Sequence, residues 1–232
     1  KSRLDKEFPA LDIEVIAGQP NAVPSSEAFR STGTEVHNGV RITRLRHTQF
    51  RKHSFFGRVT NLVTFTLSAA WTSLTLKRPD VVVTETDPFL LAFVGRWLQW
   101  RHRAKFIVYL QDIYPDIAVA VGKLREGWIS RCMRWLLFGV YRKADCVVVL
   151  SRDMERTCRE YGVAADAIRV IPNWADTARV QPQKDANQFR QEHGLDHAFV
   201  VMYSGNMGLA HTLTPILDAA EALRGHPQVC FA

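Results

Sequence analysis

Short apolar segments recur from residue 80 to residue 203, and helical patterns lie between them. This alternation constrains the fold more than any other feature of the sequence. Strand, helix, strand at this rhythm is typical of crossover units, which build a parallel sheet covered by helices. The expected strands are residues 80–85, 106–110, 145–150, 168–171 and 199–203.

The first eighty residues are less regular. Residues 11–17 and 40–46 alternate apolar and polar side chains, which predicts two strands. The second strand is expected near a sheet edge, with one face exposed to solvent. Residues 21–39 between them are polar and predict an irregular segment. A helix is expected at residues 55–76. Its weakly polar run at residues 59–76 has nearly the length of a membrane span, but the Thr, Ser and Asn side chains of this run favour a helix buried in the protein.

A chain of 232 residues that is 47% hydrophobic can form one large domain or two ordinary ones. The sequence turns polar after residue 176, which predicts a linker and divides the chain into domains at residues 1–178 and 179–232. Because the chain begins with Lys1 and ends on a strand-like segment, we expect a fragment of a longer protein. The four cysteines show no close pairing or metal-ligand spacing, which suits buried thiols in a reducing cytoplasm.

Positive charge is concentrated in the first half of the chain. Residues 36–111 contain twelve Lys or Arg against three Asp or Glu, so this segment carries +9 while the whole chain carries +7. Aromatic side chains are interleaved with these charges, a mixture that suits an anionic membrane surface. Basic helices that face solvent are the alternative. The sequence has no zinc-finger spacing or aromatic RNA-binding motif, so nucleic acid is not an expected partner.

Polar side chains stand at the carboxyl ends of several expected strands. Because the carboxyl ends of parallel strands meet at one edge of a sheet, we expect these side chains to form one wall of a ligand cleft. They are Thr84, Glu85, Thr86 and Asp87 after the first strand, Gln111 and Asp112 after the second, and Ser151 after the third.

Structural roles compete with this interpretation at several of these positions. Ser151, with Glu155 four residues later, also predicts the start of a helix, and Asn173 lies in a segment typical of turns. Pro115 and Asp116 predict another helix start, where the acid would only cap. For Asp112 the position directly after a buried strand favours a functional role.

A glycine-containing turn joins the strand at residues 199–203 to a helix expected at residues 213–223. Two glycines allow a ligand to approach the backbone closely, and the amides at the start of the helix attract phosphate. The turn lacks the third glycine and the distal acid of a dinucleotide fingerprint, and it is not a Walker loop. Its residues are Ser204, Gly205, Asn206, Met207 and Gly208.

Four segments, in this order and spacing, resemble the family-4 glycosyltransferases of the GT-B fold, and most closely the bacterial branch that builds surface polysaccharides. The resemblance covers about residues 11–232. The segments are YLQDIYPDIAVAVG, ADCVVVLSRDM, IRVIPNWAD and YSGNMGLAHTLTPILDAA.

The resemblance implies an α/β protein of the GT-B type. A Rossmann-like, parallel-sheet N-terminal domain would hold the acceptor, and the start of a second Rossmann-like domain would bind the donor. The implied enzyme is a hexosyl- or N-acetylhexosaminyltransferase. It would move a sugar from a nucleotide-diphosphate sugar to a lipid-linked saccharide with retention of configuration, without a metal or other cofactor. The implied location is cytoplasmic and peripheral, at the inner face of the plasma membrane.

The resemblance also implies roles for individual residues. The turn at residues 204–208 matches the loop that contacts the donor diphosphate, and Asn173 is placed on the same donor side. Gln111 and Asp112 stand where many relatives have a His-Asp pair near the transferred sugar, so they are the candidate catalytic residues. An amide cannot shuttle a proton at neutral pH, so Gln111 can only orient a hydroxyl. The acceptor side is expected to include Glu85, Thr86, Asp87 and Ser151.

Two features of the family are missing from the sequence, namely the first strand with its glycine-rich turn and the distal pair of acids that binds donor sugar and ribose. We therefore expect the chain by itself to be inactive. Two other classes of function stay open: a sugar-nucleotide epimerase of the GT-B type, and a fragment that docks on membranes without catalysis.

Overall fold

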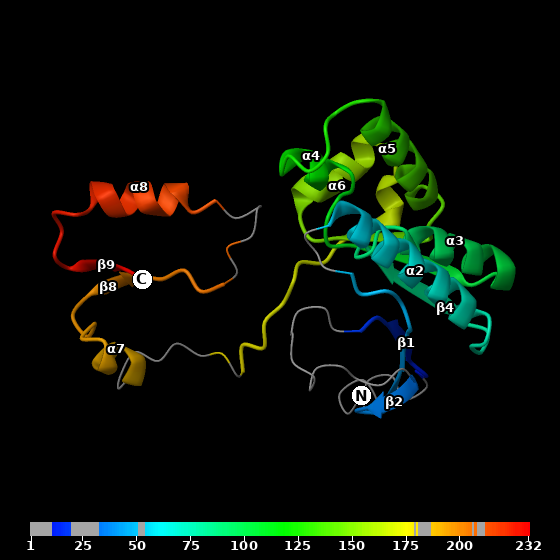
Figure 1. Cartoon of the computed structure of the whole chain (residues 1–232), viewed down its shortest axis with the longest axis horizontal. Coiled ribbons are helices and arrows are strands. Elements are labelled where there is room, and N and C mark those ends of the chain that lie inside the picture. The colour runs from blue at the N-terminus through cyan, green and yellow to red at the C-terminus, as the bar shows by residue number, and fades with distance from the viewer. Residues whose placement is uncertain are drawn as a thin grey trace. The chain divides into compact units, whose positions relative to one another are not determined.

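The structure, a computed structural model, describes residues 11–19, 33–50, 54–178, 180, 187–205, 207 and 212–232. The chain forms two compact units (Figure 1). The first unit comprises Lys1–Val119 and Leu124–Pro172, and the second comprises Ala120–Lys123 and Asn173–Ala232. The domain ranges 1–178 and 179–232 stay a prediction.

A small three-stranded sheet opens the first unit. Its strands are β1 (Glu14–Ala17), β2 (Gly33–His37) and β3 (Val40–Arg44), in the order β1-β3-β2. β3 pairs in parallel with β1 and antiparallel with β2. The prediction that the segment before β3 is irregular was therefore wrong for β2, and β3 is the central strand rather than an edge strand.

The alternating basic residues of β3 find partners on the neighbouring strands. Arg44 donates to Glu35 Oε1 from Nε at 3.0 Å and from Nη2 at 2.9 Å, and Arg41 pairs with Glu14 at 3.8 Å. These cross-strand pairs explain how a strand with a wet, basic face can lie in the centre of a sheet. Asn38 and Gly39 form the β2–β3 turn with φ values of 48° and 76°, the positive pair typical of a tight hairpin.

Helix α2 (Phe55–Ser73) follows this sheet and begins at Ser54, whose hydroxyl accepts a hydrogen bond from the Gly57 amide at 3.2 Å. The sequence predicted a buried helix. The structure instead leaves several of its large apolar side chains exposed, while its polar side chains contact the preceding loop. No described helix is both long and apolar enough to cross a membrane.

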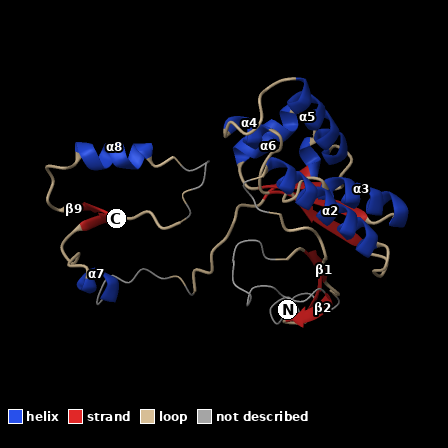
Figure 2. Cartoon of the chain, in the orientation of Figure 1, coloured by secondary structure: helices blue, strands red, loops and turns tan. Residues whose placement is uncertain are grey.

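The main sheet of the first unit is fully parallel, as predicted. Its strands are β4 (Val81–Glu85), β5 (Lys105–Leu110), β6 (Cys146–Val149) and β7 (Ile168–Val170), in the order β4-β5-β6-β7. Helices alternate with these strands (Figure 2). They are α3 (Leu91–His102), α4 (Asp116–Ala120), α5 (Trp128–Tyr141) and α6 (Arg152–Glu160), and a short 3₁₀ turn, η1 (Ala165–Ala167), precedes β7.

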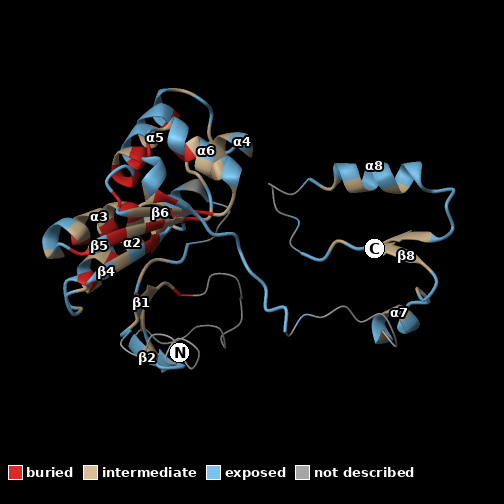
Figure 3. Cartoon of the chain, turned by 180° about the vertical axis from the view of Figure 1, so that it is seen from behind, coloured by how far each residue is buried: buried red, intermediate tan, exposed pale blue. Residues whose placement is uncertain are grey.

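The core lies between this sheet and its helices (Figure 3). Helix α3 approaches the sheet closely, because a Cβ added at Gly95 would lie 2.2 Å from the ring of Phe106. The buried side chains of α5 belong to the same apolar cluster as every second residue of β5 and β6. The largest fully buried side chains of this core are Tyr141, Phe106, Phe138, Leu110, Leu137, Val108, Val147 and Val149.

The second unit contains one parallel crossover. β8 (Phe199–Val201) pairs in parallel with β9 (Val229–Phe231), and α8 (Thr214–Ala222) connects them. The short helix α7 (Gln188–Glu192) precedes β8, and Asn187 caps it by accepting from the Arg190 amide at 3.2 Å. A strand, a helix and a second parallel strand form the smallest unit of a Rossmann-like sheet.

Candidate functional site

The carboxyl ends of the four parallel strands lie at one edge of the main sheet. Glu85 is in register with Tyr109, Leu110 with Val149, and Val149 with Val170, so neighbouring strands end at similar heights. The segments that follow these ends are therefore close together at this edge, which is termed the rim. The predicted site residues in these segments are Thr86, Asp87, Gln111, Asp112 and Ser151.

Thr86 joins the ends of β4 and β5. Its side chain is only 3% exposed, and its hydroxyl oxygen accepts hydrogen bonds from the backbone amides of Gln111 at 3.0 Å and Asp112 at 3.3 Å. A buried amide that loses its acceptor raises the free energy of the folded state. The two hydrogen bonds therefore hold the start of the loop that carries both candidate catalytic residues. Thr86 therefore positions Gln111 and Asp112 in the first unit.

The strand-end residues around Thr86 differ in exposure. Thr84 was expected to line the cleft, but it is 8% exposed and lies under α3, where its Cγ2 would be 2.7 Å from a Cβ at Gly95. Its hydroxyl oxygen has no hydrogen-bond partner among the described residues. The period of two along a strand explains this, because Thr84 and Glu85 point to opposite faces. Glu85, Asp87 and Asp112 are exposed.

Tyr114 adds a phenol to the rim that sequence reasoning did not identify. Its ring packs beside Phe89, with ring centroids 5.0 Å apart. Burial raises the pKa of the Tyr114 phenol, the carboxylates of Asp87 and Asp112 raise it further, and Arg58 opposes this effect. The phenol therefore stays protonated at neutral pH and can donate a hydrogen bond beside two carboxylates.

These four groups come from three separate segments of the chain. Asp87 follows β4, Asp112 and Tyr114 follow β5, and Arg58 lies in the first turn of α2. The position of Tyr114 two residues after Asp112 is a sequence signal that could have identified it. No sequence signal places Arg58 at this edge, because its location depends on how α2 packs.

Ser151 and Asp116 have clear structural roles. The Ser151 hydroxyl accepts from the Met154 amide at 3.2 Å and caps α6, which is the alternative that the sequence left open. Asp116 begins α4 and accepts from Arg134 Nε at 2.8 Å, and Arg134 Nη1 also donates to Glu126 at 3.2 Å. This network fixes the turn after Asp112 to α5.

The predicted donor-side residues lie in the second unit and are described on their own. Asn173, Ser204 and Gly205 are exposed, and Met207 is 78% exposed. Among the described residues, the atoms nearest to a Cβ added at Gly205 would be those of Tyr203, with its hydroxyl oxygen at 3.6 Å and its ring at 3.7 Å, both ordinary contact distances. The packing of the described residues therefore does not require glycine there. Asn206 and Gly208 lie outside the described residues.

The start of α8 is suited to bind an anion. Its N-terminal residue Leu213 makes no side-chain capping bond, and Pro215 occupies the first turn. Because Pro215 has no amide hydrogen and the Ile216 amide donates to the Leu213 carbonyl at 3.0 Å, the positive end of the helix dipole is what favours an anion at this start. In the part of the chain that the structure describes, no three His, Cys, Asp or Glu side chains are grouped so that they could hold a metal ion.

Comparison with known proteins connects this architecture to one family. The family model described as glycosyl transferase 4-like domain matches residues 6–174. WcaI of Escherichia coli (strain K12), named as a glycosyl transferase of colanic acid biosynthesis, is 26% identical over 187 residues, which are 77% of this chain and 46% of WcaI. WbjE of Pseudomonas aeruginosa, named as a glycosyltransferase, is 30% identical over 151 residues, which are 64% of this chain and 38% of WbjE. The chain thus spans less than half the length of both relatives.

Solved structures confirm the fold class. The Anabaena protein HepE in complex with UDP and glucose has a TM-score of 0.55 at 16% identity, over 83% of this chain and 47% of HepE. Sucrose-phosphate synthase from Thermosynechococcus elongatus has a TM-score of 0.58 at 14% identity, over 98% of this chain and 61% of that protein. The predicted α/β fold of the GT-B type is therefore correct (Figure 1).

Proposed function

Because the chain belongs to the glycosyl transferase 4-like domain family, we propose that it acts as a glycosyltransferase in the biosynthesis of a cell-surface polysaccharide. The observation that carries this proposal is the family match, which spans the main sheet and its rim. The name of WcaI, which includes colanic acid biosynthesis, supports the polysaccharide product. The complex of HepE with UDP and glucose supports a nucleotide-diphosphate sugar as donor.

The donor side of the proposed site lies in the second unit. Ser204, Gly205 and Met207 follow β8, and their amides would bind the diphosphate together with those of Asn206 and Gly208, which lie outside the described residues. The room at Gly205 supports this role, because a bound phosphate can approach a backbone that carries no side chain. Asn173 would contact the donor from the segment after β7.

The acceptor side of the proposed site is the rim. Glu85 and Asp87 are exposed acids that would accept hydrogen bonds from sugar hydroxyls. Thr86 contributes by holding the loop after β5, and Ser151 by capping α6. The protonated phenol of Tyr114 would orient a hydroxyl of the acceptor between Asp87 and Asp112.

The proposed chemistry is transfer with retention of configuration and without a metal. In such a transfer the leaving diphosphate gains negative charge while the sugar ring becomes cationic. The amides before α8 would stabilise the diphosphate, and the exposed carboxylate of Asp112 would stabilise the positive charge on the sugar ring. Gln111 would fix the orientation of a sugar hydroxyl, because an amide is both donor and acceptor. The transferred group would be a hexosyl or N-acetylhexosaminyl residue.

The proposed acceptor is a saccharide linked to a lipid, which places the enzyme at the cytoplasmic face of the plasma membrane. Labelled UDP-glucose is the first donor to test, since UDP and glucose occupy HepE. The assay uses the full-length enzyme, because this chain spans less than half the length of its relatives. We expect label in the lipid-linked saccharide, with the donor's anomeric configuration. A donor that is epimerised or hydrolysed while the acceptor gains no sugar would refute the proposal.

A further inference from the structure

Six large apolar side chains of α2 and its C-terminal cap form an exposed stripe, termed the α2 stripe. Phe56 is 81% exposed, Leu67 is 64% exposed and Trp71 is 73% exposed. At about 100° per residue, all six fall within an arc of about 120° on the helix. The members of the α2 stripe are Phe56, Val59, Val63, Leu67, Trp71 and Leu74.

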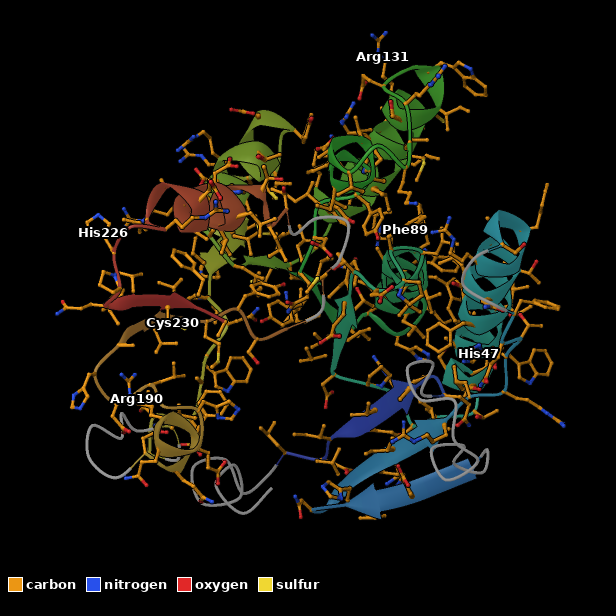
Figure 4. All side chains as sticks on the ribbon, turned by 60° about the vertical axis from the view of Figure 1, so that its left-hand side comes forward. His47, Phe89, Arg131, Arg190, His226 and Cys230 are labelled. Atoms are coloured by element: carbon orange, nitrogen blue, oxygen red, sulfur yellow. The ribbon has the colours of Figure 1, made fainter. Side chains whose placement is uncertain are left out.

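The opposite side of α2 holds the helix on the protein through polar and aromatic contacts. Asn61 Oδ1 accepts from the Phe50 amide at 2.9 Å, and its Nδ2 donates to the Phe50 carbonyl at 2.9 Å. The Phe65 ring packs edge-on against the ring of His47, with ring centroids 5.3 Å apart; Figure 4 labels His47. These contacts fix the rotation of α2, so the α2 stripe points away from the other elements of the first unit.

Helices α2 and α3 and the residues that flank them carry positive charge and no acid of their own, although Asp12 lies 4.0 Å from Lys77 just after α2 and Asp87 and Asp112 lie at the rim near its start. Residues 54–79 and 88–105, which include α2 and α3, contain seven Lys or Arg and no Asp or Glu. The Arg78 guanidinium donates to the His102 carbonyl at 2.8 Å, which joins the ends of α2 and α3. Arg101 and Arg103 are exposed at the end of α3, next to Trp100, which is 71% exposed. Apolar and aromatic side chains bordered by cations match an anionic lipid surface.

We propose that the α2 stripe docks this unit on a bilayer that contains anionic lipid. The stripe is about 27 Å long at 1.5 Å per residue, so α2 would lie along the surface rather than cross it. Arg58, in the first turn of α2, lies near enough to Tyr114 to oppose the rise of its pKa, so the N-terminal end of α2 is near the rim. Docking would therefore bring the rim to the membrane, where the lipid-linked acceptor of the proposed function would enter.

A second group of exposed apolar side chains, on α5, has a different electrostatic setting. Trp128 and Trp135 are 78% and 68% exposed. Two carboxylates, those of Asp116 and Glu126, lie beside this helix and bind Arg134. These two acids offset part of the positive charge of the α5 region, in which residues 123–143 carry six Lys or Arg, whereas α2 and α3 contain no acid.

Vesicle flotation of this chain tests the proposal. The vesicles are phosphatidylcholine alone or phosphatidylcholine mixed with phosphatidylglycerol. We expect binding to the anionic vesicles, weakened between about 0.1 M and 1 M salt, where the Debye length falls from about 10 Å to about 3 Å. Leu67→Glu should lower the partition at least roughly tenfold, because it replaces apolar anchoring area with a charge.

Leu217→Glu is the matched control, since Leu217 is 65% exposed on α8 and Leu67 is 64% exposed on α2. It should bind vesicles as the unmodified chain does, and both variants should keep the circular dichroism spectrum. Arg101→Glu should weaken binding to anionic vesicles. Equal flotation of Leu67→Glu and the unmodified chain, or a dimer in solution that Leu67→Glu separates, would overturn the proposal. If the protein binds anionic vesicles but transfers no sugar, only the proposed function is refuted. If it transfers sugar but does not bind the vesicles, only the docking is refuted.

Discussion

Replacing Thr86 by valine tests whether its hydroxyl holds the loop that carries the candidate catalytic residues. Valine keeps the shape of the side chain but removes the oxygen that accepts from the amides of Gln111 and Asp112. Two lost hydrogen bonds of about 1 kcal/mol each give a loss of about 2 kcal/mol in the free energy of unfolding. In a unit of this size the same loss lowers Tm by roughly 4–8 °C.

Urea unfolding followed by tryptophan fluorescence measures this loss, and hydrogen exchange localises it. Thr86→Ser is the control, because it keeps the oxygen and loses only a methyl group. The amides of Gln111 and Asp112 should exchange faster in Thr86→Val than in Thr86→Ser or the unmodified protein. If Thr86→Val protects these two amides as well as the serine variant does, the loop is held by something other than this hydroxyl.

Two further predictions concern the first unit. The Asp145 carboxylate has a lowered pKa because Lys105 donates to it at 2.7 Å and the Phe106 amide also donates to it. The stability that this carboxylate contributes is present above its unfolded pKa of about 3.8 and is lost as the pH falls through its lower folded pKa. In urea titrations, Asp145→Asn should therefore have a lower free energy of unfolding than the unmodified protein at pH 7, and the same free energy of unfolding in acid. Burial raises the pKa of the Cys158 thiol to about 11, whereas Cys132 is exposed. Iodoacetamide at pH 8 should therefore modify Cys132 and leave Cys158 unmodified in the mass spectra of proteolytic peptides, and equal modification of both would contradict the burial.

Much of the fold could be predicted from the sequence, because buried parallel strands leave short apolar runs that helices separate. β2 was missed although Asn38 and Gly39 form the tight turn that such a pair favours, so its signal was present. The exposure of α2 could not be predicted in the same way. Periodicity shows that a helix has an apolar face but not whether another element covers it, and Asn61 and Thr64 were needed to hold its other side.

The candidate site could be predicted in part. The positions directly after β4, β5 and β6 do lie at one edge, because parallel strands end together. Thr84 was misplaced because the alternation along β4 was not applied to its end. Arg58 was missed because it reaches the rim through the packing of α2, a contact between distant segments that no local pattern records. The catalytic and binding roles of the rim residues stay predictions.

We infer that the carboxylate of Asp112 takes part in sugar transfer. The most direct measurement compares kcat and donor Kd of Asp112→Asn with those of the unmodified full-length enzyme, using Asp80→Asn as a control at the opposite end of β4. We predict that Asp112→Asn lowers kcat by about 10²-fold or more, as expected for a positioned catalytic group, while donor Kd and the Asp80→Asn enzyme change little. Near-normal turnover of Asp112→Asn with a lowered Tm would contradict the claim and leave Asp112 with the capping role of a turn residue.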